Sequence, residues 1–146
     1  MKEHVPYNPS VIEPKWQKRW KESKIYEVDL DSKNDKNFFS LTMFPYPSGD
    51  LHIGHWYAFT PADSYSRFKK MKGFNVLHTQ GFDAFGLPAE NAAISRNINP
   101  MKWTFDNIDN MRNQFNLMGN SYDWSRELIT CKPCLLYTSP SPRDRG

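Results

Sequence analysis

Residues 42–55 constrain the fold of this chain more than any other stretch, and they read Thr-Met-Phe-Pro-Tyr-Pro-Ser-Gly-Asp-Leu-His-Ile-Gly-His. An apolar run with strand character, residues 38–44, leads into the stretch, and apolar residues at helical spacing follow it over 58–68. A Pro/Gly turn therefore joins a strand to a helix, with His52 and His55 at the mouth of that helix. Unpaired backbone N–H groups and the helix dipole favour anions there, so the sequence predicts a phosphate site.

The residues around this turn decide between a nucleotide site and an ordinary surface turn. His52 and His55 are three positions apart and share one side of a first helical turn, and Gly54 leaves room between them for a flat ligand. The His-x-Gly-His tetrapeptide alone fits a turn with two surface histidines equally well. With its lead-in, however, Met-Phe-Pro-Tyr-Pro-Ser-Gly-x-Leu-His-Ile-Gly-His resembles the first signature of class I aminoacyl-tRNA synthetases, in the form found in leucyl-tRNA synthetases.

The order of elements after the connector predicts an α/β fold. A strand over 38–44, nearly all apolar, suits a parallel strand covered on both faces. The next helix ends before Gly73, and Pro61 requires it either to kink or to begin with Thr60 as its cap. A second strand over 74–78 completes a right-handed crossover unit. We therefore expect the first half of a doubly wound, Rossmann-like parallel sheet.

The loops that follow the two strands, residues 45–55 and 80–88, should share one rim of this sheet. Asp83 is the one carboxylate of the second loop before the next helix. A half-buried carboxylate needs a cationic partner, such as the α-ammonium of an amino acid, although Asp83 could instead cap the turn. Gly-Phe-Asp-Ala-Phe-Gly-Leu-Pro-Ala-Glu-Asn resembles the second leucyl synthetase signature, which implies that Asp83 holds the substrate amine. Phe82 stands where that family more often has tryptophan.

The flanking segments divide the chain into three parts. In residues 1–37, Ile12, Trp16 and Trp20 predict an amphipathic helix whose indoles join the core, followed by an exposed polar connector. The opening also resembles that of leucyl, isoleucyl and valyl synthetases. Residues 38–132 form the nucleotide-binding part, with further helices over about 88–96 and 100–118. Residues 133–146 have no apolar period and resemble a foreign tail, so we expect disorder there.

Composition narrows the function classes only a little. The 146 residues, 38% hydrophobic and 24% charged, suit one globular domain. A net charge of +3 is too small to indicate a basic surface for nucleic acid. Neither an apolar run of ~18–20 residues nor a secretory signal is present, so we expect a cytoplasmic protein with no membrane partner. Cys131 and Cys134 have no second ligand pair, which argues against a zinc site, and no thioredoxin-like context, which argues against a redox site.

The resemblance implies a reaction and a set of site residues. Leucine and ATP, with Mg²⁺, would form leucyl-adenylate, and leucine would then pass to tRNA(Leu). The implied catalytic residues are His52 and His55, which with Gly54 would bind ATP. Leucine would contact Asp83 and a pocket formed by Met43, Phe44 and Tyr46, although these last three could equally belong to the core.

Alternative interpretations remain at this stage. The chain could come from an isoleucyl or valyl synthetase or a related nucleotidyltransferase, or it could be a binding module for a nucleotide or another protein, without catalysis. The sequence contains no Lys-Met-Ser-Lys-Ser type loop and no editing or anticodon-binding part, so we expect the chain by itself to be inactive.

Overall fold

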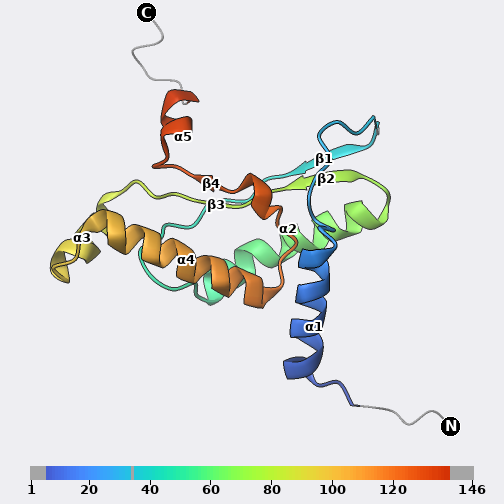
Figure 1. Ribbon diagram of the computed structural model, residues 1–146, viewed down its shortest axis with the longest axis horizontal. Coiled ribbons are helices and arrows are strands. Elements are labelled where there is room, and N and C mark those ends of the chain that lie inside the picture. Colours follow the sequence, from blue (N-terminus) through green and yellow to red (C-terminus); the bar gives the residue numbers. More distant parts are fainter. Residues whose placement is uncertain (1–5, 34, 139–146) are drawn as a thin grey trace, which may run out of the picture.

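Two pairs of parallel strands and the helices beside them form the part of the chain that the computed structural model describes, residues 6–33 and 35–138 (Figure 1). Strand β1 (Asn37–Ser40) pairs in parallel with β2 (Asn75–His78), and β3 (Gly81–Phe82) pairs in parallel with β4 (Leu128–Ile129). Helix α2 (Ile53–Met71) connects β1 to β2. The α/β class with parallel strands is therefore confirmed.

Four further helices and a short 3-10 turn complete the described part of the chain. They are α1 (Pro9–Glu22), α3 (Leu87–Ser95), α4 (Pro100–Met118), a 3-10 turn (Trp124–Arg126) and α5 (Pro133–Thr138). The Asn99 side chain accepts the first N–H groups of α4, and Gly119 ends that helix with a left-handed φ of +72°. In Figure 1, α2, α3 and α4 lie on one side of the strands and α5 lies on the other.

The hydrophobic core lies between α2, α4 and the short β3–β4 pair. Its buried side chains are mostly aromatic. They belong to Phe59, Phe82, Ile108, Met111, Phe115, Tyr122 and Ile129. The rings of Phe59 and Phe115 lie 5.5 Å apart, and Phe115 also contacts Tyr122 edge-on. Because Phe115 touches residues from three segments, α4 fixes how α2 sits against the strands.

A buried polar network fastens α2 to the chain segment that follows α4. One carboxylate oxygen of Asp63 accepts hydrogen bonds from the backbone N–H and the hydroxyl of Ser121, at 2.5 and 2.6 Å. The other oxygen accepts from Nε of Arg67 at 2.8 Å. Arg67 also donates to the Tyr26 hydroxyl and to the Gly119 carbonyl. Together these contacts fix the helix whose first turn carries the paired histidines.

Strand β1 is shorter and more exposed than its sequence predicts. It ends at Ser40 instead of at residues 43–44, because its partner β2 ends at His78 and the next strand, β3, hydrogen-bonds to β4 instead. The side chain of Phe39 is 55% exposed. The expectation of a strand covered on both faces is therefore wrong for this chain.

Helix α1 forms as predicted, but its indoles do not enter the core. No residue of α1 is buried, and Trp16 is 42% exposed with the Arg19 guanidinium over its ring. The helix crosses the end of α4 and is held there by Gln17, which donates to the Leu117 carbonyl at 3.2 Å. Trp20 packs edge-on against Tyr26. The amphipathic stripe therefore contacts a neighbouring helix end and leaves Trp16 at the surface.

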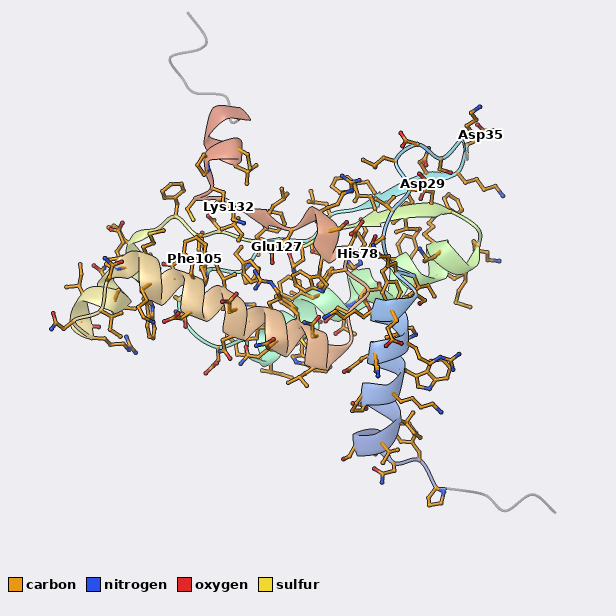
Figure 2. All side chains as sticks on the ribbon, in the orientation of Figure 1. Asp29, Asp35, His78, Phe105, Glu127 and Lys132 are labelled. Atoms are coloured by element: carbon orange, nitrogen blue, oxygen red, sulfur yellow. The ribbon has the colours of Figure 1, made fainter. Side chains whose placement is uncertain are left out.

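The two segments expected to lack structure behave differently. The connector before β1 is largely exposed. Asp35 lies at its outer end, away from the helices (Figure 2), and the Asp29 carbonyl accepts a hydrogen bond from the Asn75 side chain at the start of β2. The expectation of disorder from residue 133 onward is wrong for Pro133–Thr138, which form α5 because proline suits a first helical position. Residues 139–146 lie outside the described part of the chain.

Within the described ranges, no helix is both long and apolar enough to cross a membrane.

Candidate functional site

The turn between β1 and α2 is held by amide side chains of α4. Asn107 donates to the Pro47 carbonyl at 3.1 Å, and Gln114 accepts from the Leu51 N–H at 2.8 Å. Asn110 and Gln114 both donate to the Asp50 carboxylate. These amides were not among the site residues predicted from the sequence. Their spacing along one helical face was the available signal, but it does not reveal which loop the face contacts.

His52 and His55 cap the first turn of α2. The Nδ1 atom of His52 accepts the Gly54 N–H at 3.1 Å, and the Nδ1 atom of His55 accepts the His52 N–H at 3.0 Å. The arrangement is a reciprocal capping box in which two imidazoles take the places of the usual hydroxyl and carboxylate. Helix α2 therefore starts at Ile53 and continues through Pro61 without a break, so Thr60 does not cap it.

These caps determine which tautomer each imidazole adopts. A nitrogen that accepts a backbone N–H carries no proton, so the neutral rings of His52 and His55 hold their proton on Nε2. The ring centroids lie 4.0 Å apart. Burial lowers the pKa of His55, and the nearby charge that His52 would carry lowers it further. A neutral His55 at pH 7 thus offers one Nε2–H donor at the helix N-terminus.

Gly54 leaves space for the His52 ring. A Cβ atom at position 54 would lie 2.8 Å from Cε1 and 2.9 Å from Nδ1 of His52, closer than real side chains approach. The glycine therefore allows His52 to fold back over the helix start. The His55 ring in turn stacks on Phe59, with centroids 5.9 Å apart, so the pair is tied to the core.

Asp83 lies beside the loop that leads to the histidines. Its backbone N–H donates to the Pro45 carbonyl at 3.0 Å, which joins the two strand-following loops as expected. The half-buried carboxylate accepts the Thr130 hydroxyl at 3.3 Å. No cationic side chain of the described residues forms an ion pair with it. Asp83 thus keeps acceptor capacity for a positively charged ligand.

The three apolar candidates are arranged unequally. Phe44 is half-buried against Gly81, where a Cβ atom would lie 2.9 Å from its Cε2 atom. Met43 is 82% exposed and Tyr46 is 55% exposed, so neither is a core residue. Leu41, Thr42, Met43 and Phe44 line an open hollow at this edge. Within the described chain, Met43 and Phe44 therefore lie at this hollow, whereas Tyr46 does not line it.

Comparison with known proteins places this site in a family. The family described as tRNA synthetases class I (M) matches residues 38–126, the segment that carries both loops. Leucine–tRNA ligases of Dehalococcoides mccartyi and Thermosipho melanesiensis are 55% and 58% identical to the chain, over 87% and 90% of its length. The chain spans only 16% and 15% of those two proteins.

A solved structure supports the same placement. The ternary complex of Agrobacterium radiobacter K84 agnB2 LeuRS with tRNA and LeuAMS superposes with a TM-score of 0.84 and 41% identity. The match covers 90% of this chain and 17% of that one. The paired histidines and Asp83 lie within the segment matched by the family, and the fold around them is that of the solved enzyme. The chain therefore belongs to the class I tRNA synthetase family.

Proposed function

We propose that the chain is the N-terminal part of a leucine–tRNA ligase and carries one half of the site that activates leucine. The observation that supports this most directly is the reciprocal capping of His52 and His55, which leaves two Nε2–H donors at a helix N-terminus. The curated relatives support leucine as the amino acid. Because the chain spans about 16% of such a relative, the complete activity belongs to the longer protein.

The first chemical step needs no general base from this site. A leucine carboxylate oxygen forms a bond to the α-phosphorus of ATP, while the bond from that phosphorus to the bridging oxygen breaks and pyrophosphate leaves. The carboxylate is already ionised at pH 7, so no proton moves. The protein accelerates the step by positioning the reactants and by stabilising the charge that develops on the phosphate oxygens.

His52 and His55 would provide that stabilisation. Their Nδ1 atoms are occupied by backbone N–H groups, so each ring can donate only through Nε2. Fixed donors cost little reorganisation when charge develops on the phosphates. Gly54 would keep room for the His52 ring over the helix start, and the α2 dipole would add to the attraction for the phosphates.

The second loop would hold the amino acid. Asp83 would accept hydrogen bonds from the leucine ammonium, because its half-buried carboxylate has no protein cation beside it within the described chain. Met43, Phe44 and Tyr46 would form one wall around the leucine side chain. A pocket of this kind separates amino acids that differ by one methylene by only about 1–3 kcal/mol.

Mg²⁺ would enter with ATP as part of the substrate. Within the described residues, no group of three or more His, Cys, Asp or Glu side chains could hold a metal ion. In the second step, a hydroxyl at the tRNA(Leu) terminus would attack the leucyl carbonyl and AMP would leave. We place this reaction in the cytoplasm, where translation takes place.

Two measurements test this function. In the longer parent protein, leucine should drive exchange of pyrophosphate into ATP, and exchange with valine or isoleucine but not leucine would refute the assignment. In the present chain, ATP should shift the indole N–H signal of Trp56, which adjoins the histidines, and this shift should be lost in His52→Ala and His55→Ala. Met71→Ala, at the opposite end of α2 and 86% exposed, is the control. Binding unaffected by the histidine variants would favour a non-catalytic module.

A further inference from the structure

A second hollow lies between α1 and the C-terminal end of α4, in a region that the proposed reaction does not use. It has a volume of about 520 Å³, within the range of about 300–1,000 Å³ typical of small-molecule sites. Gly119 lines it and accepts a hydrogen bond from Arg67. At 1.5 Å per residue, Arg67 is roughly 20 Å along α2 from His52, so the hollow is distinct from the histidine site.

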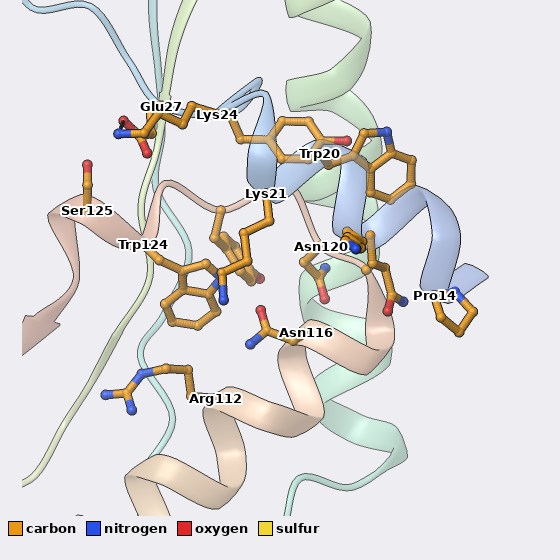
Figure 3. A pocket seen from close by; sticks show the side chains of 15 residues that line it. Pro14, Trp20, Lys21, Lys24, Glu27, Arg112, Asn116, Asn120, Trp124 and Ser125 are labelled. Atoms are coloured by element: carbon orange, nitrogen blue, oxygen red, sulfur yellow. Dashed lines mark hydrogen bonds and ion pairs between the residues drawn. The ribbon is translucent and has the colours of Figure 1, made fainter. Parts of the chain in front are cut away.

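Lys21 carries the one positive charge of this hollow that lacks an acidic partner among the described residues. The other lining cations are paired, Lys18 with Glu22, Lys24 with Glu27, and Arg112 with Glu127. Figure 3 shows the Lys21 side chain reaching between Trp124 and Asn116. An ammonium group in this position attracts an anionic group that enters the hollow.

The walls of the hollow suit a planar heterocycle. Trp20 and Trp124 contribute indole surface, and the Trp124 ring is held in place by Phe115 and Tyr122, at centroid distances of 6.0 and 5.7 Å.

We infer that this hollow binds a nucleotide, with its base against the indole surface of Trp124 and its phosphate on Lys21. Stacking on an aromatic ring is worth about 1–3 kcal/mol per base and does not depend strongly on which base it is. The same chemistry is offered by a free mononucleotide and by one nucleotide of a single-stranded RNA.

The test uses the five indole N–H signals of the 146-residue chain in a ¹⁵N–¹H NMR spectrum. Adenosine monophosphate and a single-stranded adenylate pentanucleotide are titrated separately. We expect the Trp20 and Trp124 signals to shift with both probes. Lys21→Ala should weaken this binding at least tenfold, while Lys15→Ala, a lysine of α1 outside the hollow, should leave it unchanged.

The outcomes distinguish a free nucleotide from RNA, and binding in the hollow from binding at the histidines. Tenfold or tighter binding of the pentanucleotide identifies RNA as the source, and equal affinity identifies the free nucleotide. In the doubly substituted His52→Ala, His55→Ala chain, shifts of Trp56, which adjoins the histidines, should disappear while those of Trp20 and Trp124 persist. If neither probe moves Trp20 and Trp124, or if Lys21→Ala leaves their shifts unchanged, the hollow is not a nucleotide site.

Discussion

Replacing Asp63 by alanine should destabilise the fold far more than removing an exposed ion pair of the same spacing. The Asp63 carboxylate accepts two hydrogen bonds from Ser121 and one from Arg67, and Asp63 is 7% exposed. The substitution leaves the Ser121 N–H and the Arg67 Nε–H without their acceptor. The imidazole of His78, whose Nδ1 atom lies 3.8 Å from Asp63, also loses its nearest carboxylate.

The expected loss follows from the exposure of the two partners. Removing one member of a buried ion pair costs about 3–5 kcal/mol. The Arg67 side chain is 30% exposed and keeps its contacts with Tyr26 and Gly119, so the lower end applies, about 3 kcal/mol. Small domains are stable by only about 5–15 kcal/mol in total. With an m-value of about 2 kcal/mol/M, the urea midpoint should fall by about 1.5 M.

The assay is urea unfolding followed by tryptophan fluorescence, with two comparison variants. Asp106→Ala removes the ion pair with Lys102, also four residues apart, but with side chains 59% and 68% exposed. It should cost only about 0.3–0.5 kcal/mol. Asp63→Asn keeps one carbonyl oxygen for Ser121, so its urea midpoint should lie between those of Asp63→Ala and Asp106→Ala. If Asp63→Ala and Asp106→Ala lower the urea midpoint equally, the Asp63 network does not fasten α2 to the segment that follows α4.

Three further predictions concern single positions. Gly54→Ala should displace the His52 ring and abolish ATP binding at the start of α2. Loss of the cap and gain in helix propensity, each about 1 kcal/mol, should nearly cancel in urea unfolding. An unchanged ATP-induced shift of the Trp56 signal would contradict this prediction. Burial lowers the pKa of His78 to about 4. Because the folded protein then holds a neutral imidazole, His78 adds about 3 kcal/mol to the free energy of unfolding above pH 6.5, and this is lost as the pH falls toward 4. His78→Gln should flatten that part of the stability profile. Gly119→Ala should cost about 1 kcal/mol, because the left-handed φ of +72° disfavours a Cβ atom while the surrounding contacts tolerate one, and Gly119→Asn should cost less.

Local sequence determined the helices and the order of the elements. Helix α4 is specified by Asn99-Pro100 at its start, by apolar residues at 3–4 spacing, and by Gly119 at its end. The strand–helix–strand order predicted the parallel β1–β2 pair. The turn that we propose binds phosphate could also be identified from the sequence, because histidine, glycine and a helix start are neighbours in the chain. Such signals depend on residues a few positions apart, and these can be read without knowing the fold.

Tertiary structure decided which faces are covered and which distant groups meet. The indole of Trp16 stays exposed because α1 crosses only the end of α4, a placement that helical periodicity does not specify. The tautomers of the paired histidines follow from backbone groups that become available only when the turn closes. Asp63 and Ser121 are 58 residues apart in the chain, and only folding brings them to 2.5 Å. A sequence pattern shows that a side chain is suited to a role, whereas the partner that completes the role comes from the packing of distant segments.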